Sequence, residues 1–369
     1  MTNHDYKQNA YYLIYLIRCV LHNKVPAQEK LGKMNLSQLF EVAQRHTLTA
    51  ICAYALESAG IFDKAFTEAK NKAIRKNIIL DAEREKVFAE FEKAGIWYMP
   101  LKGIILKDYY PKIGMRQMAD NDFLIDKNFQ SEIKDIMISC GFKTEQFDKS
   151  KHDVYFKEPV CNFQMHISLF EIDSKETFYN YFKDIDKRLI SVDDYSFAKS
   201  FTNEDFYLYI KAHEYKHYSS SGTGLRNLVD TYIYINKFGN ALDWKYLNTE
   251  LTKLDICDYE KNSRKLAMLL FSGQQLNDNE KEMLDYYIFS GTYGNVENNV
   301  NNKISKHNGN KLKYIVSRTI LPMSLVRKSY PMFYKYKILL PFLPFYRLIK
   351  NRKKNKKKII TEIKTLIKS

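Results

Sequence analysis

The first 94 residues carry apolar side chains at three- and four-residue spacing, which is the period of an amphipathic helix. The stretches YYLIYLIRCVL and LSQLFEVAQRHTLTAICAYAL show this spacing most clearly. A long helix is predicted from Phe66 to Ala94, with Gly95 placed to end it. We therefore expect residues 1–94 to form an N-terminal helical region.

The spacing changes after Gly95. IWYMPLKG is a short apolar run that ends in glycine, as a strand entering a turn does, and DNDFLID alternates polar and apolar residues like a half-buried strand. NFQSEIKDIMISCGF has helical spacing again, and HDVYFKEP and NFQMHISLF predict further strands. These features predict a small α/β unit over residues 95–172.

Helical spacing returns in residues 173–290, most clearly in EDFYLYIKAHEYKHY and GLRNLVDTYIYINKF. The segment 291–311 is polar and rich in asparagine, which predicts an exposed loop or linker. We expect residues 291–369 to consist of this linker, a helix and a basic tail.

The composition is that of a globular protein, because 45% of the 369 residues are hydrophobic and 27% are charged. The five cysteines lie far apart without a C-x-x-C pair, which indicates reduced thiols in a cytoplasm. The polar start MTNHDYKQNA predicts no signal peptide, and no stretch reaches the roughly 18 apolar residues of a membrane helix. We expect a cytoplasmic protein.

The net charge of +15 is concentrated at the C-terminal end. From Arg347 onward there are ten Lys and Arg residues and one acid, Glu362. The stretch KYKILLPFLPFYRLIKNRKKNKKK places aromatic and aliphatic residues beside this basic run, which suits peripheral attachment to an anionic membrane. RNA is a less favoured partner, and the alternative is a solubilising tail behind a packed C-terminal helix.

Two carboxylates stand out in the α/β unit. Asp120 and Asp122 are two residues apart on a predicted strand, so their side chains face the same side, an arrangement suited to a hard divalent cation. Upstream, Lys102 and Gly103 follow the preceding strand, where glycine lets the backbone approach a phosphate. Arg116 supplies a second cation, or else pairs with one of the two aspartates. Together these residues predict a phosphoryl- or nucleotidyl-transfer site.

Four motifs follow one another in the order LKG (101–103), YYP (109–111), MRQMADND (115–122) and FQMH (163–166). In this order they resemble the uncharacterised bacterial nucleotidyltransferase family of the polymerase-β-like superfamily. The N-terminal helices, the basic, proline-containing C-terminal region and the segments NEDFYLYIKAHEYKH, GLRNLVD and LDW are also similar to that family.

The resemblance implies an α+β fold. A small mixed β-sheet with helices on one face would form a nucleotidyltransferase core, flanked by N- and C-terminal helical regions. It also implies Mg²⁺, an NTP (ATP being the expected one) and transfer of a nucleotidyl group to a hydroxyl acceptor that the sequence does not identify. Asp120 and Asp122 would hold the metal and take part in catalysis. The residues expected at the nucleotide are Lys102, Gly103, Arg116 and His166.

One position departs from the family pattern. The family's third carboxylate is expected two residues before His166, where this chain has Gln164, and an amide cannot take a proton at neutral pH. Asp153 and Glu158 are the nearby acids that could replace it. The alternative function is therefore a catalytically weakened nucleotide-binding protein or a membrane-peripheral interaction protein. His166 itself is alternatively a core histidine.

The stretch HEYKH (213–217) matches the H-E-x-x-H pattern of zinc proteases. Lys216 at one x position would oppose a metal charge, and no glycine and third histidine follow. We therefore expect no zinc, and place His213 and His217 near the acceptor cleft. Arg226 and Asp230 lie four apart on a predicted helix, which indicates an ordinary surface pair.

Overall fold

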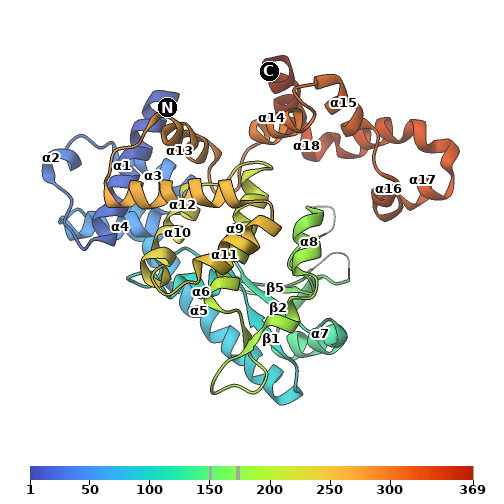
Figure 1. The fold of residues 1–369 in the computed structure, drawn as a ribbon, viewed down its shortest axis with the longest axis horizontal. Coiled ribbons are helices and arrows are strands. Elements are labelled where there is room, and N and C mark those ends of the chain that lie inside the picture. The colour runs from blue at the N-terminus through green and yellow to red at the C-terminus, as the bar shows by residue number, and fades with distance from the viewer. Residues whose placement is uncertain (149–151, 172–174, 369) are drawn as a thin grey trace. The chain divides into compact units, whose positions relative to one another are not determined.

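The computed structural model describes residues 1–148, 152–171 and 175–368. The chain divides into two compact units (Figure 1). The first contains Met1–Lys216 and Gly224–Thr292, and the second contains His217–Thr223 and Tyr293–Ser369. The predicted division into four segments stays a prediction. No described helix has a stretch long and apolar enough to cross a lipid bilayer.

The first unit begins with five helices: α1 (Asn3–Leu21), α2 (Gln28–Leu31), α3 (Leu36–Arg45), α4 (Thr49–Ser58) and α5 (Lys64–Ala94). The side chain of Asp63 accepts a hydrogen bond from the Phe66 N–H at the start of α5. Gly95 ends α5 in the left-handed conformation, with φ of 69°, which glycine adopts without steric cost. The predicted long helix and its glycine end are confirmed.

A mixed five-stranded sheet follows α5. Its strands are β1 (Tyr98–Pro100), β2 (Asn121–Ile125), β3 (Lys143–Gln146), β4 (His152–Lys157) and β5 (Cys161–His166), arranged in the order β1-β2-β5-β4-β3. β2 and β5 are parallel, and all other neighbours are antiparallel. The short helix α6 (Lys102–Lys107) comes directly after β1, and α7 (Gln130–Ser139) lies between β2 and β3. The predicted α+β class is confirmed, whereas β3 was not expected.

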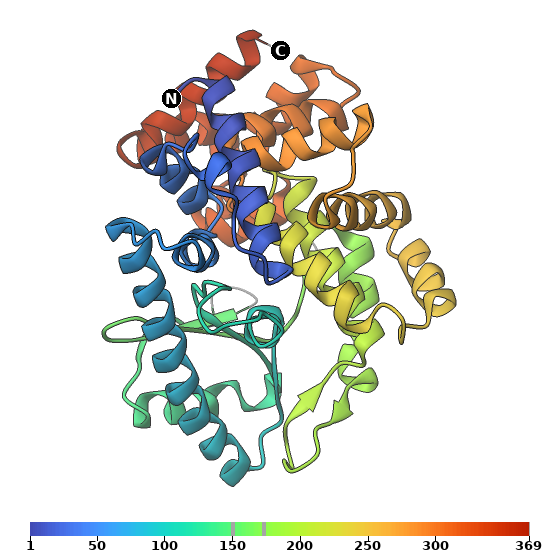
Figure 2. The same cartoon turned by 90° about the vertical axis from the view of Figure 1, so that its left-hand side faces the viewer.

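Helices cover both faces of the sheet. On one face Phe123, Phe163 and Met165 pack in a buried cluster with residues of α5 and α7, and α5 runs alongside the sheet (Figure 2). On the other face Met99 and Leu124 pack with residues of α9 (Asn203–Tyr218). The expectation that helices lie on one face alone is therefore wrong, because α9 brings its own large apolar side chains to the second face.

The remaining elements of the first unit are helical apart from one two-stranded pair. They are α8 (Glu176–Phe182), β6 (Ile190–Ser191), β7 (Lys199–Ser200), α9, α10 (Leu225–Phe238), α11 (Trp244–Lys253), α12 (Cys257–Ser272) and α13 (Asp278–Ser290), with short 3₁₀ turns at Lys127–Phe129 and Ile185–Arg188. The start of α10 is fixed by His46, whose Nδ1 accepts the Leu225 N–H at 3.1 Å. A Cβ on Gly224 would lie 2.7 Å from the Thr292 nitrogen, so only glycine permits this approach.

The second unit contains α14 (Val296–Lys306), α15 (Lys311–Thr319), α16 (Met323–Ser329), α17 (Pro331–Lys335), a 3₁₀ turn (Lys337–Phe342) and α18 (Leu343–Lys368). The prediction of a loop over 291–311 is wrong, because α14 occupies much of it. Asn295 caps α14 by accepting the Asn298 N–H, and Val300 and Ile304 are buried against Tyr314. The polar composition of this segment did not predict a helix. Two apolar residues one turn apart, Val300 and Ile304, are enough to give α14 a buried face.

Candidate nucleotidyltransferase site

Asp120 directly precedes β2 and Asp122 is the second residue of this strand, which runs parallel to β5. Asp122 stands directly opposite Gln164 in the register. The Gln164 amide donates a hydrogen bond from Nε2 to Asp120 Oδ2 at 2.9 Å, and His166 Nε2 lies 3.3 Å from Asp122 Oδ1. The parallel pairing of two strands thus brings together four residues that the sequence analysis selected.

The two carboxylates are held close enough to repel each other. Burial, followed by the negative charge of Asp122, raises the pKa of Asp120 to about 6. The positive charges of Lys102, Arg226 and Lys76 act in the opposite direction on the same pKa. The carboxylate pair therefore costs folding free energy at neutral pH, and a bound cation would relieve that cost.

Lys102 is the first residue of α6 and reaches α9. Its Nζ lies 2.8 Å from Nδ1 of His213, and because an ammonium group has only donors, the ring nitrogen is the acceptor. Burial and the charges of Arg116 and Arg226 lower the pKa of Lys102 to about 8, while Asp230 and Asp122 oppose the shift. His213, the first histidine of HEYKH, thus contacts the predicted phosphate-binding lysine.

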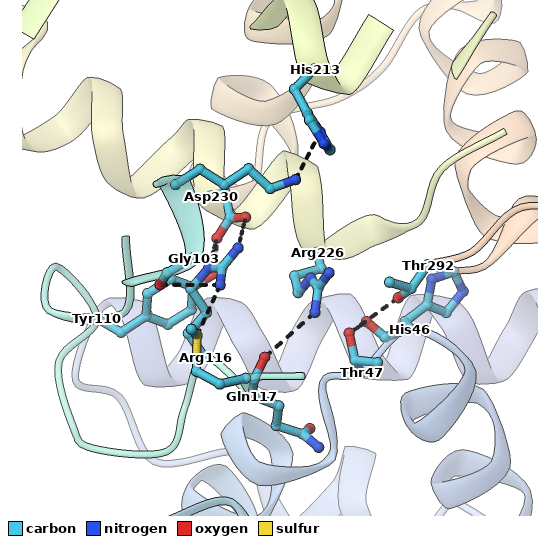
Figure 3. Close-up of polar contacts among 12 residues, drawn as sticks. His46, Thr47, Gly103, Tyr110, Arg116, Gln117, His213, Arg226, Asp230 and Thr292 are labelled. Carbon is cyan, nitrogen blue, oxygen red and sulfur yellow. Dashed lines mark hydrogen bonds and ion pairs between the residues drawn. The ribbon is translucent and has the colours of Figure 1, made fainter. Parts of the chain in front are cut away.

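Arg116 forms a buried ion pair with Asp230 of α10 (Figure 3). Its Nε lies 2.9 Å from Asp230 Oδ1 and its Nη2 lies 3.0 Å from Oδ2, and the Tyr110 hydroxyl donates to the same carboxylate at 2.7 Å. The alternative interpretation, in which Arg116 pairs with Asp120 or Asp122, is wrong, because its partner is Asp230. A role for Arg116 at a triphosphate stays a prediction.

The environments of Gly103 and Asp230 also differ from expectation. Lys102 and Gly103 form the first turn of α6 and not a loop that closes β1. A Cβ on Gly103 would lie 3.2 Å from Arg116 Nη1, so glycine here leaves room for the guanidinium. Asp230 is 5% exposed, so the interpretation of Arg226 and Asp230 as a surface pair is wrong.

Neither acid proposed as a replacement for the third carboxylate takes that place. Asp153 is fully buried, stands opposite Met165 rather than Gln164, and accepts hydrogen bonds from the Gln130 side chain and the Asp148 N–H. Glu158 is exposed in the turn between β4 and β5. Within the described ranges of the chain, no group of three or more His, Cys, Asp or Glu side chains could hold a metal ion.

The sequence did not predict that several other residues lie near the two carboxylates. Lys76 of α5 donates to the Ala119 carbonyl at 2.6 Å. Arg226 of α10 donates to the Gln117 carbonyl at 3.5 Å (Figure 3). His152 of β4 stands opposite His166, with ring centroids 4.8 Å apart. Alternation along β4 could have placed His152 on this face, whereas no local signal connects α5 or α10 with β2.

A carboxylate pair at the start of a central strand, flanked by lysine and arginine from neighbouring helices, is suited to binding a metal ion and a phosphate chain. Such a site on a small mixed sheet places the protein in the nucleotidyltransferase class. The chain belongs to the family described as uncharacterised nucleotidyltransferase, whose family model matches residues 32–272, from the end of α2 to the end of α12. The resemblance seen in the sequence is confirmed. No curated protein and no solved structure matches the chain.

The buried pair yields a stability prediction. Asp230→Ala leaves the Arg116 charge buried without its carboxylate, and should lower the free energy of unfolding by about 3–5 kcal/mol in urea unfolding experiments. The double variant Arg116→Met/Asp230→Leu removes both charges, so it should lose much less. Equal losses in the single and double variants would contradict this account.

The pKa of Asp120 yields a prediction on pH. Because this pKa is raised from 3.8 to about 6, ionisation between these values costs native stability as the pH rises. Asp120→Asn cannot ionise, so it should exceed the wild type by about 1–2 kcal/mol above pH 6 and match it below about pH 4. Thermal unfolding across this range measures the difference. Asp193→Asn, at an exposed position, is the control. An equal gain in the free energy of unfolding for this variant would show that the raised pKa of Asp120 is not the cause.

Proposed function

We propose that the protein is a magnesium-dependent nucleotidyltransferase, which moves an NMP group from an NTP, with ATP the expected one, to a hydroxyl group of an acceptor. The observation that carries the proposal is the Asp120–Asp122 pair beside Gln164, with Lys102 and Arg226 acting on it. Membership of a nucleotidyltransferase family supports the general class of reaction.

The donor set fits magnesium. Asp120 and Asp122 supply carboxylate oxygens, which hard divalent cations prefer, and burial, followed by the charge of Asp122, raises the pKa of Asp120. Since Gln164 donates through Nε2 to Asp120, its Oε1 remains as a neutral oxygen ligand. When bound, magnesium would supply Lewis-acid stabilisation of the charge on the phosphate oxygens.

The cationic residues fit a triphosphate. Lys102 and Arg226 carry positive charge towards the carboxylates from α6 and α10, and Lys76 adds a third charge from α5. The half-buried Lys102 is held by His213, so its ammonium group is oriented before a ligand arrives. His166, fixed against Asp122, would lie beside the nucleotide.

Gln164 would orient Asp120 and cannot itself take a proton at neutral pH. Once Asp120 and Asp122 hold magnesium, the charge of the ion lowers the pKa of both carboxylates, so neither serves as a general base. The proposal therefore has magnesium lower the pKa of the attacking hydroxyl, whose proton passes to solvent.

A catalytically weakened nucleotide-binding protein is the second candidate function. It is favoured by the amide at position 164 and by the lack, among the residues that the structure describes, of a third acid or histidine able to complete a metal cluster. This candidate shares the binding site and differs only in turnover.

The metal site is tested by calorimetry with ATP in the presence and absence of Mg²⁺. The double variant Asp120→Asn/Asp122→Asn should lose the magnesium-dependent part of ATP binding while its circular dichroism stays that of the wild type. Asp193→Asn should bind as the wild type does. If the double variant keeps an unchanged magnesium-dependent affinity for ATP, Asp120 and Asp122 are not the magnesium ligands.

The amide at position 164 is tested by single substitutions. Gln164→Glu adds a third carboxylate opposite Asp122, and should tighten magnesium binding and raise transfer at least several-fold, with the 10²–10⁴-fold of general-base catalysis as the upper range. Gln164→Ala removes the hydrogen bond to Asp120 and should slow transfer. If the wild type is already fast and Gln164→Glu slows it, the glutamine itself serves the chemistry and this reading of position 164 is wrong.

A further inference from the structure

A hollow of about 540 Å³ lies between α1, the segment around α2, and the chain that joins α12 to α13. Its volume is within the 300–1,000 Å³ of typical small-molecule sites. None of Asp120, Asp122, Gln164 and Lys102 lines it. The hollow is therefore separate from the candidate transfer site, although both lie in the first unit.

Aromatic side chains of one helix form a wall of this hollow. Tyr11, Tyr12 and Tyr15 follow one another at positions i, i+1 and i+4 of α1, and Ile14 and Leu270 add apolar surface. Flat aromatic surface of this kind suits a ligand with a planar ring.

Tyr15 is held in place at both its hydroxyl and its ring. The hydroxyl accepts the Ala27 N–H at 2.8 Å. Lys30 Nζ and the Arg18 guanidinium carbon lie 4.3 and 5.8 Å from the ring centre. The tyrosine thus ties α1 to the following segment and brings two cations to the hollow.

The charges around the hollow do not cancel. Four cations and one acid line it: Arg18, Lys30, Lys33, Lys281 and Glu29. Lys33 is paired with Glu29 at 2.6 Å and Lys281 with Asp278 at 3.0 Å. The side chains of Arg18 and Lys30 make no hydrogen bond or ion pair with any other described residue. Two positive charges are therefore left for a ligand.

The position of Arg18 is built into the fold. Gly273 ends α12 with φ of 79°, and a Cβ on this residue would lie 2.6 Å from Arg18 Nη1. The half-buried guanidinium thus rests against glycine, where a side chain would displace it. An arginine fixed in this way, without an acidic partner, is preorganised to bind an anion in two-point fashion.

We propose that this hollow binds a small molecule that contains both a phosphate group and a planar ring, as a nucleoside monophosphate does. Arg18 and Lys30 hold the phosphate, and the tyrosines of α1 lie against the ring. The site needs neither the two aspartates nor magnesium, so the proposal does not depend on the proposed transfer reaction.

The test is calorimetry of the full chain with AMP in EDTA, in the background Asp120→Asn/Asp122→Asn/Lys102→Gln, which removes the carboxylates and the lysine of the transfer site. AMP should bind, and more weakly as salt is added. Arg18→Gln and Lys30→Gln should each weaken binding by about tenfold or more, because a hydrogen bond to a charged group is removed.

Controls separate this site from general attraction of anions. Arg75→Gln and Lys64→Gln, exposed cations of α5 away from the hollow, should leave AMP binding unchanged. Tyr11→Ala, at a residue that is 37% exposed, should weaken the binding of AMP but not of inorganic phosphate. Adenosine should bind much more weakly than AMP.

Three results would each overturn the proposal. The first is no measurable AMP binding by the background protein. The second is equal AMP affinity in Lys30→Gln and Lys64→Gln, since Lys30 is exposed and its replacement does not threaten the fold. The third is inorganic phosphate binding as tightly as AMP, which would leave the tyrosine wall without a role.

Discussion

The ion pair between Arg116 and Asp230 holds the candidate site together. Both side chains are almost wholly buried, so each charge depends on the other for its stability. The pair joins the segment between β1 and β2 to α10, and through Gly103 it also fixes the first turn of α6. Lys102 precedes Gly103 on α6 and Arg226 precedes Asp230 on α10 by one helical turn. The pair thereby places both cations near the carboxylates of β2.

The site is a balance between like and opposite charges. β2 and β5 bring Asp120, Asp122 and Gln164 together, and burial, followed by the charge of Asp122, raises the pKa of Asp120. Burial and the charges of Arg116 and Arg226 lower the pKa of Lys102. A protein selected for stability alone would avoid both shifts, because each reports a native charge that is less favourable than in water. Shifted pKa values of this kind concentrate at functional sites, and they support a transfer site on this face of the sheet.

The sequence predicted those features that depend on neighbours along the chain. The end of α5 at Gly95 and the strands β2 and β5 follow from local spacing and from the conformational freedom of glycine. Motif order identified Asp120, Asp122, Gln164 and His166 before any contact was known. Their hydrogen bonds then followed from a parallel pairing that spacing alone does not specify.

Features that depend on distant partners were not predictable. Arg116 and Asp230 are 114 residues apart, and nothing in either local pattern shows that both are buried. Asp230 was instead paired with Arg226, its neighbour by helical spacing. The helix α14 was missed for a related reason, since its asparagines are typical of loops, while its stability rests on Val300 and Ile304 packing against Tyr314. Local composition is a weak guide where tertiary packing decides.

Transfer of a nucleotidyl group is the central claim, and isotope position tests it most directly. The protein would be incubated with Mg²⁺ and each NTP labelled either at the α- or at the γ-phosphate, together with lysate fractions that supply acceptors. The account predicts that the α-label enters an acceptor and the γ-label is released in pyrophosphate, with neither event in the Asp120→Asn/Asp122→Asn variant. Transfer of the γ-label to the acceptor, or equal α-labelling by that variant, would contradict it.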